Sequence, residues 1–154
     1  MRNVVRLLAV AAALTVGMAF AAPGHAEDKA KTHRIVFQID QNDPALMNLV
    51  LNNVSNVLEY YHHKGEEAEV EVVAYGPGLN MLRDDKSPVK DRLKSIHSGS
   101  FPSKVAYSAC GNTMKGMEKK EGHPITIVPE AKVVTAGVVR LTELQEAGWT
   151  YIRP

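Results

Sequence analysis

The sequence predicts an α/β fold, a three-layer sandwich around a mostly parallel sheet of about five strands. Two observations predict this class. Segments rich in β-branched residues alternate with segments whose apolar residues recur at helical spacing. The helical segments are about ten residues or longer, as right-handed crossovers between parallel strands require.

The first strand is expected at 33–39, which is rich in Ile, Val and Phe. Polar turn residues follow, among which Asp43 is a natural N-cap and Pro44 suits the first helical position. The spacing of apolar residues then predicts a helix from 45 to about 62. Gly65 is a candidate for its C-cap.

The second strand is expected at 68–75, ahead of the loop Gly76-Pro77-Gly78 and a short helical turn over 79–83. Two glycines around a proline predict a rigid loop that a ligand or another chain can approach closely. A further helix is expected from Pro88 to about Ser98.

The third strand ends at Cys110 and leads into a short helix. The remaining segments are expected to be a polar, mobile stretch at 118–123, a weakly alternating stretch at 125–128 that leads to a strand at 132–134, a helix at 138–147 and a final strand at 149–153.

The N-terminus resembles a secretory signal peptide over residues 1–26. Arg2 and Arg6 precede an uncharged apolar run, and cleavage signatures end at Ala21 and Ala26. The apolar run is shorter than the roughly 20 residues of a membrane-spanning helix. We therefore expect an exported protein, periplasmic or secreted, with a short flexible segment at 27–32 and one domain at 33–154.

Charge and composition exclude some partners. The chain has 18 Lys and Arg residues against 17 Asp and Glu residues, and without residues 1–26 the balance is 16 against 17. A nearly neutral surface argues against nucleic acid, which needs a basic patch. No later segment is long and apolar enough to span a membrane, so none is expected after signal cleavage.

The turns after the first four strands are expected to meet, because the carboxyl ends of parallel strands share one edge of a sheet. This places Cys110 in a shared pocket. The expected lining residues are Gly76, Pro77, Gly78, Gly111, Asn112, Thr113 and Gly137. Asn53 falls on the apolar helix face, where its amide is expected to brace a loop or a ligand.

Cys110 is the only cysteine of the chain. Backbone N–H groups at the start of the following helix favour the thiolate, the reactive form of cysteine, and Lys115 adds a nearby cation. Free cysteine is also among the most buried residue types. The sequence thus leaves two interpretations open, a reactive thiol and a small buried hydrophobe.

Copper offers a third interpretation. Cys110, Met114 and Met117 are spaced to share a helix face, His123 follows, and soft sulfur ligands select Cu(I). The chain contains neither a phosphate-binding loop with its lysine nor a Gly-x-Ser-x-Gly elbow, and no histidine is assigned beside Cys110. A carrier or binding protein is therefore favoured over a stand-alone enzyme, and no cofactor is expected.

From about His33 to Pro154 the chain resembles the DsrE/DsrF-like family of small sulfur-relay proteins, and within it the exported single-domain members. The stretches that carry the resemblance are 51–57 (LNNVSNV), 72–79 (VVAYGPGL), 109–114 (ACGNTM), 136–139 (AGVV) and 148–154 (GWTYIRP).

The resemblance implies a parallel α/β fold of the DsrE/flavodoxin-like type, a symmetric homo-oligomer and a cysteine that carries sulfur as a persulfide. By position only Cys110 matches such a carrier. The expected partners are a small sulfur species or a sulfur-transfer protein. Two alternatives stay open: a non-catalytic oligomeric ligand-binding module in which Cys110 is structural, and a Cu(I)-binding protein.

Overall fold

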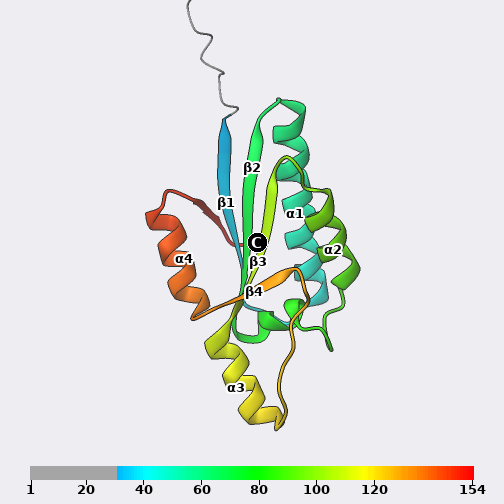
Figure 1. Ribbon diagram of the computed structural model, residues 1–154, viewed down its shortest axis with the longest axis vertical. Coiled ribbons are helices and arrows are strands. Elements are labelled where there is room, and N and C mark those ends of the chain that lie inside the picture. The colour runs from blue at the N-terminus through cyan, green and yellow to red at the C-terminus, as the bar shows by residue number, and fades with distance from the viewer. Residues whose placement is uncertain (1–30) are drawn as a thin grey trace, which may run out of the picture.

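The computed structural model describes residues 31–154 and contains one sheet of five parallel strands in the order β4-β3-β2-β1-β5 (Figure 1). The strands are β1 (Thr32–Ile39), β2 (Glu67–Ala74), β3 (Lys104–Cys110), β4 (Ala131–Val134) and β5 (Thr150–Ile152). The predicted α/β class is confirmed. The strand order differs from that of flavodoxin-like folds, because β1 here lies between β2 and β5 rather than between β2 and β3.

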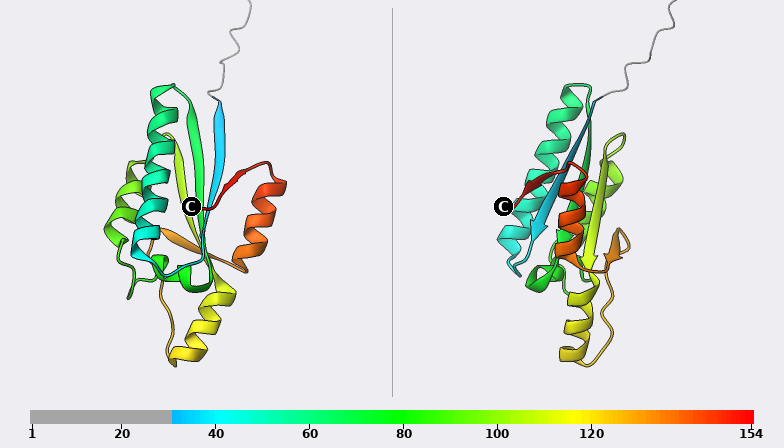
Figure 2. Two further views of the ribbon diagram at one scale, coloured as in Figure 1. Left: turned by 180° about the vertical axis from the view of Figure 1, so that it is seen from behind. Right: turned by 90° about the vertical axis from the view of Figure 1, so that its left-hand side faces the viewer.

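Helices cover both faces of the sheet, as Figure 2 shows. Helices α1 (Pro44–His63) and α2 (Lys90–Gly99) pack on one face, and α4 (Gly137–Glu146) packs on the other. The chain moves across the sheet in one direction from β1 to β4 and then returns from β4 to β5. Since right-handed crossovers place the helix according to that direction, the return requires α4 on the opposite face.

The larger hydrophobic core lies under α1 and α2. Alternate residues of the strands supply it, and in β3 these are Val105, Tyr107 and Ala109. A smaller cluster lies under α4 and contains Val36, Val73, Leu141 and Leu144. The strand side chains that point toward α4 therefore lie in a less apolar environment than those under α1 and α2. Polar and titratable strand side chains, including Glu71, Ser108 and Cys110, lie on this side.

Two connections differ from the sequence-based expectation. Gly76-Pro77-Gly78 is not a free loop but the start of the 3-10 helix η1 (Gly76–Leu82). A Cβ on Gly78 would lie 2.6 Å from the backbone carbon of Ile39. Gly78 therefore packs closely against β1 and is buried, which makes its interpretation as a ligand-approach position wrong.

The segment after Cys110 is more ordered than predicted. Helix α3 (Gly111–Glu121) continues through the stretch that was expected to be mobile, and it projects beyond the carboxyl edge of the sheet (Figure 1). Gly122 caps it in the left-handed conformation. The stretch 125–128 is not a strand, since only Ile127 forms an isolated antiparallel bridge, with Arg83.

The expected signal peptide at 1–26, with its cleavage sites at Ala21 and Ala26, lies outside the described residues. Within 31–154, no helix combines the length and the apolar character that a membrane crossing requires.

Candidate functional site

Cys110 is the last residue of β3 and occupies the N-cap position of α3. The alternation of the strand turns its side chain, like that of Ser108, toward the α4 side of the sheet. The residue is buried, with 5% of its surface exposed. Its environment is set by two helix N-termini, those of α3 and α4, which meet at this point of the edge.

Hydrogen-bond donors surround the sulfur. Burial by itself would raise the pKa of the Cys110 thiol. The Thr113 hydroxyl and the backbone N–H groups of Gly137, Thr113 and Asn112 oppose this effect, and together they lower the pKa below the ordinary value of 9.0. The arrangement favours a thiolate, since each donor is satisfied best by the negatively charged sulfur.

Thr113 connects the sulfur to the adjoining loop. Its Oγ1 accepts a hydrogen bond of 3.0 Å from the backbone N–H of Gly76. The same hydroxyl lies near Cys110, on the first turn of α3, and lowers the pKa of its thiol. Thr113 is therefore a positioning residue for the thiolate.

The two helix starts are held together by close backbone packing. The Asn112 N–H donates to the Thr135 carbonyl oxygen at 3.2 Å. A Cβ on Gly137 would lie 2.8 Å from the Tyr75 Cβ and 3.3 Å from the Cys110 Cβ, so only glycine fits there without a shift. A Cβ on Gly111 would similarly lie 3.1 Å from the Val134 carbonyl oxygen.

The predicted pocket residues divide into three groups. Gly111, Asn112, Thr113 and Gly137 surround Cys110. Gly76, Pro77 and Thr113 line an open cleft of about 870 Å³ beside α3, which Cys110 itself does not line. Gly78 and Asn53 belong to neither place. Lys115 is exposed rather than turned toward the sulfur.

Asn53 is far from the edge because of the direction of its helix. It lies nine residues after Pro44, which starts α1, so it is about 14 Å along α1 from the carboxyl edge. Its partial burial reflects packing of the middle of α1. The expectation that Asn53 belongs to the pocket is therefore wrong.

The copper arrangement does not form. Met114 and Met117 pack against the larger core, on the α1 and α2 side, whereas Cys110 turns to the α4 side. Among residues 31–154 there is also no group of three or more His, Cys, Asp or Glu side chains placed to hold a metal ion. The three sulfur atoms therefore do not constitute a common ligand set.

The structure contains a buried arginine that the sequence pattern does not indicate. Arg83 is fully buried after η1, where its guanidinium makes paired hydrogen bonds to Asp85 (2.8 and 2.6 Å) and to Glu121 (2.6 and 2.9 Å). These contacts fasten the C-terminal end of α3 to the core. Nothing in the local sequence distinguishes Arg83 from a surface residue, because its partner Glu121 is distant in the chain.

Glu71 is a second buried charge. It lies on the α4 side of β2, accepts a hydrogen bond from Ser108, and pairs with Arg140 through two contacts of 2.8 Å. Burial would raise the pKa of Glu71, but the hydrogen bonds from Arg140 and Ser108 and the charge of Lys132 lower it. A glutamate within the apolar run 70–74 was the sequence feature that could have indicated this buried charge. This cluster fixes α4 to the sheet and so supports the position of Gly137.

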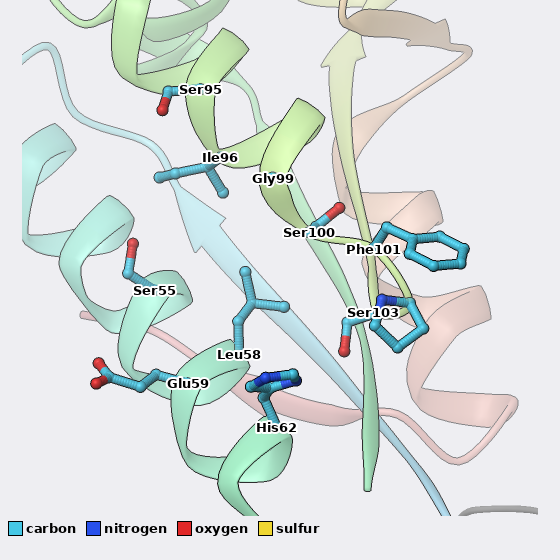
Figure 3. Close-up of a pocket in the computed structure, with 11 residues that line it drawn as sticks. Ser55, Leu58, Glu59, His62, Ser95, Ile96, Gly99, Ser100, Phe101 and Ser103 are labelled. Carbon is cyan, nitrogen blue, oxygen red and sulfur yellow. The ribbon is translucent and has the colours of Figure 1, made fainter. Parts of the chain in front are cut away.

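A separate groove of about 440 Å³ lies between α1 and α2 (Figure 3). Leu58 and Ile96 form its apolar floor, Glu59 and His62 stand at its rim, and Phe101 is almost fully exposed beside it. This groove is formed near the C-terminal end of α1 and the residues that precede β3. It lies toward the amino edge of the sheet, away from Cys110.

Comparison with solved structures identifies a relative of this chain. No family model matches the chain, and no curated protein matches it. A solved structure similar to it is that of MTH1491 from Methanobacterium thermoautotrophicum, a protein of unknown function. The two are 32% identical over 79% of this chain and 99% of that chain, with a TM-score of 0.67. This chain therefore belongs to the same protein family as MTH1491.

Proposed function

We propose that this protein is an exported sulfur carrier that holds sulfane sulfur as a persulfide on Cys110, in the manner of the DsrE/DsrF-like proteins it resembles. The observation that carries the proposal is the place of Cys110 where the starts of α3 and α4 meet, so that the Thr113 hydroxyl and nearby backbone N–H groups lower the pKa of its thiol. A persulfide anion gains from the same donors as a thiolate, because its charge is also on sulfur.

The loading step requires no external oxidant or reductant. The Cys110 thiolate attacks the outer sulfur of a persulfide donor R–S–SH, so that a new S–S bond forms on Cys110 while the S–S bond of the donor breaks. The leaving thiolate R–S⁻ keeps the proton balance by taking up the proton released when the new persulfide ionises. One sulfur atom moves, and the total number of S–S bonds is unchanged.

A structural role is the main alternative for Cys110. A buried cysteine that only fills space needs apolar neighbours, and donors aimed at its sulfur would gain little from a neutral thiol. Here the starts of α3 and α4 meet at Cys110, and their N–H groups lower the pKa of its thiol. The donor set therefore favours the carrier over the structural cysteine.

Intact-mass spectrometry tests the proposal. After incubation with inorganic polysulfide at neutral pH, the protein is expected to gain about 32 Da, the mass of one sulfur atom, on Cys110. Cys110→Ala is expected to show no gain. If the wild-type protein shows no gain either, or if the variant gains the same mass, the carrier proposal is refuted.

Replacing Thr113 by Val should make the Cys110 thiol less reactive. The substitution removes the hydroxyl that lowers the pKa of Cys110 and accepts a hydrogen bond from the Gly76 N–H, so the pKa of the thiol should rise. We expect alkylation of Cys110 at neutral pH to become several-fold slower. Thr113→Ser keeps the hydroxyl and should react at nearly the wild-type rate. Equal rates for all three proteins would contradict the role assigned to Thr113.

We further propose that the protein forms a homo-oligomer through β4 and the start of α4. Val138 and Val139, at the start of α4, are 62% and 51% exposed beside the outer edge of the terminal strand β4. Lys132, Arg140 and Glu143 flank these valines and carry charges of both signs. Mixed charges around an apolar centre suit contact with a second copy, in which each patch meets its own image.

Val139→Asp should reduce the oligomer to monomers, because it places a charge in the middle of the apolar contact. Light scattering during size-exclusion chromatography measures the mass directly. Leu49→Asp is the matched control, since Leu49 is 46% exposed on α1 at the other face of the sheet. A monomeric wild-type protein, or an oligomer that survives Val139→Asp, would contradict the proposed surface.

A further inference from the structure

The open cleft beside α3 carries an excess of positive charge. Its charged lining residues are Lys86, Lys120, Glu121 and His123. The only carboxylate among them, Glu121, accepts hydrogen bonds from the buried Arg83. It also accepts a hydrogen bond of 2.8 Å from Lys86. These contacts lower the pKa of Glu121 to about 2, so that it remains ionised and paired.

Lys120 is a cation of this cleft that has no ion-pair partner among residues 31–154. Within residues 31–154 it has no carboxylate within 4.0 Å, whereas Lys86 is paired with Glu121. His123 contacts Glu121 at 3.5 Å and adds a second positive charge when it is protonated. An anion entering the cleft therefore meets an unpaired ammonium group rather than a neutralised one.

Thr113 joins this cleft to the sulfur. It lines the cleft, and it lies on the first turn of α3, three residues after Cys110, the N-cap residue of that helix. Lys120 follows seven residues later on the same helix, which is about 10 Å along its axis. A ligand whose reactive end reaches Thr113 while its charge reaches Lys120 must be elongated. A compact inorganic anion spans only part of this distance.

We propose that the cleft binds an elongated thiol persulfide that carries a carboxylate, with its persulfide end at Thr113 and its carboxylate at Lys120. This inference rests on the proposed function and names the class of sulfur donor. The amide side chains of Asn42 and Asn80 line the same cleft and suit the peptide-like polar groups of such a donor. Transfer follows R–S–SH + Cys–SH → R–SH + Cys–S–SH, in which one S–S bond breaks and one forms.

Two donors of different length test the inference. Glutathione persulfide is the elongated, carboxylate-bearing probe. Inorganic disulfide, the ion HS–S⁻, is the compact probe. With glutathione persulfide, Lys120→Gln should load Cys110 about threefold to tenfold more slowly than the wild type, because a rim charge acts mainly on association. With inorganic disulfide the two proteins should load at the same rate.

The control is Lys119→Gln, an exposed lysine on the same helix that does not line the cleft. It should load at the wild-type rate with both donors. Equal slowing in Lys119→Gln and Lys120→Gln, or no slowing in Lys120→Gln, would overturn the inference and leave the carrier proposal standing.

Binding of unreactive S-methylglutathione separates the two proposals. Titration followed by NMR should shift the amide signals of Thr113 and its neighbours in the wild type, with weaker binding in Lys120→Gln. Binding of this kind without any sulfur transfer would refute the carrier and keep the cleft as an anion site. Absence of binding would overturn the cleft inference, whatever the outcome of the transfer assay.

Discussion

Arg83→Met is expected to lower the free energy of unfolding by about 3 kcal/mol, the lower end of the range for breaking a buried ion pair. The Arg83 side chain is fully buried, and it makes four hydrogen bonds to Asp85 and Glu121. Both carboxylates keep partial access to water, which limits the cost of losing their partner. Urea unfolding at neutral pH measures the difference.

The matched control is Arg92→Met. Arg92 is only partly buried on α2, and its partners are the neutral side chains of Asn48 and Asn52. Its loss should cost less than about 1.5 kcal/mol, as expected for ordinary hydrogen bonds. Equal losses of stability in the two variants would contradict the anchoring role of Arg83.

The same cluster predicts the pH dependence of the effect. The pKa of Glu121 is lowered from 4.5 to about 2 by Arg83 and Lys86, and that of Asp85 is also lowered by Arg83. The stabilisation from a lowered carboxyl pKa is present above the unfolded value and is lost as the pH falls toward the folded value. The stability difference between wild type and Arg83→Met should therefore shrink between about pH 4.5 and pH 2.

Gly137→Ala is expected to slow the reaction of Cys110 at neutral pH by about tenfold and to destabilise the fold by roughly 1–3 kcal/mol. The new Cβ would lie 2.8 Å from the Tyr75 Cβ and 3.3 Å from the Cys110 Cβ, so the start of α4 must move away. Movement of α4 withdraws the Gly137 N–H from the sulfur, and the pKa of Cys110 should then rise.

Gly99→Ala provides the control for this substitution. A Cβ on Gly99, at the end of α2, meets no atom within 4 Å. The variant should retain both the stability and the thiol reactivity of the wild type. If Gly137→Ala reacted like Gly99→Ala, the contribution of α4 to the thiolate would be disproved.

The sequence predicted the strands and the place of Cys110 because these depend on local patterns. Alternating β-branched residues identified the strands, and the polarity of the chain put the end of β3 at the carboxyl edge. The glycines at 111 and 137 were also assigned to that edge correctly. Residue type and spacing sufficed for all of these positions.

What was not predicted depends on contacts between distant residues. The length of α3 depends on the pairing of Glu121 with Arg83, which no local pattern reveals. Met114 and Met117 match Cys110 in helical spacing, yet Cys110 belongs to the strand end and turns the other way. Asn53 was misplaced because its burial was visible in the pattern, whereas its distance from the edge follows from the direction of α1.

The central claim is that the starts of two helices lower the pKa of the Cys110 thiol, and the pH dependence of its alkylation tests this directly. Iodoacetamide reacts with the thiolate, so the rate against pH gives the pKa of Cys110 in the folded protein and, in urea, in the unfolded chain. We expect the folded midpoint to lie below the unfolded one, because the donors from Thr113, Asn112 and Gly137 outweigh burial. A folded midpoint equal to or above the unfolded one, or no reaction in the folded state, would contradict the claim.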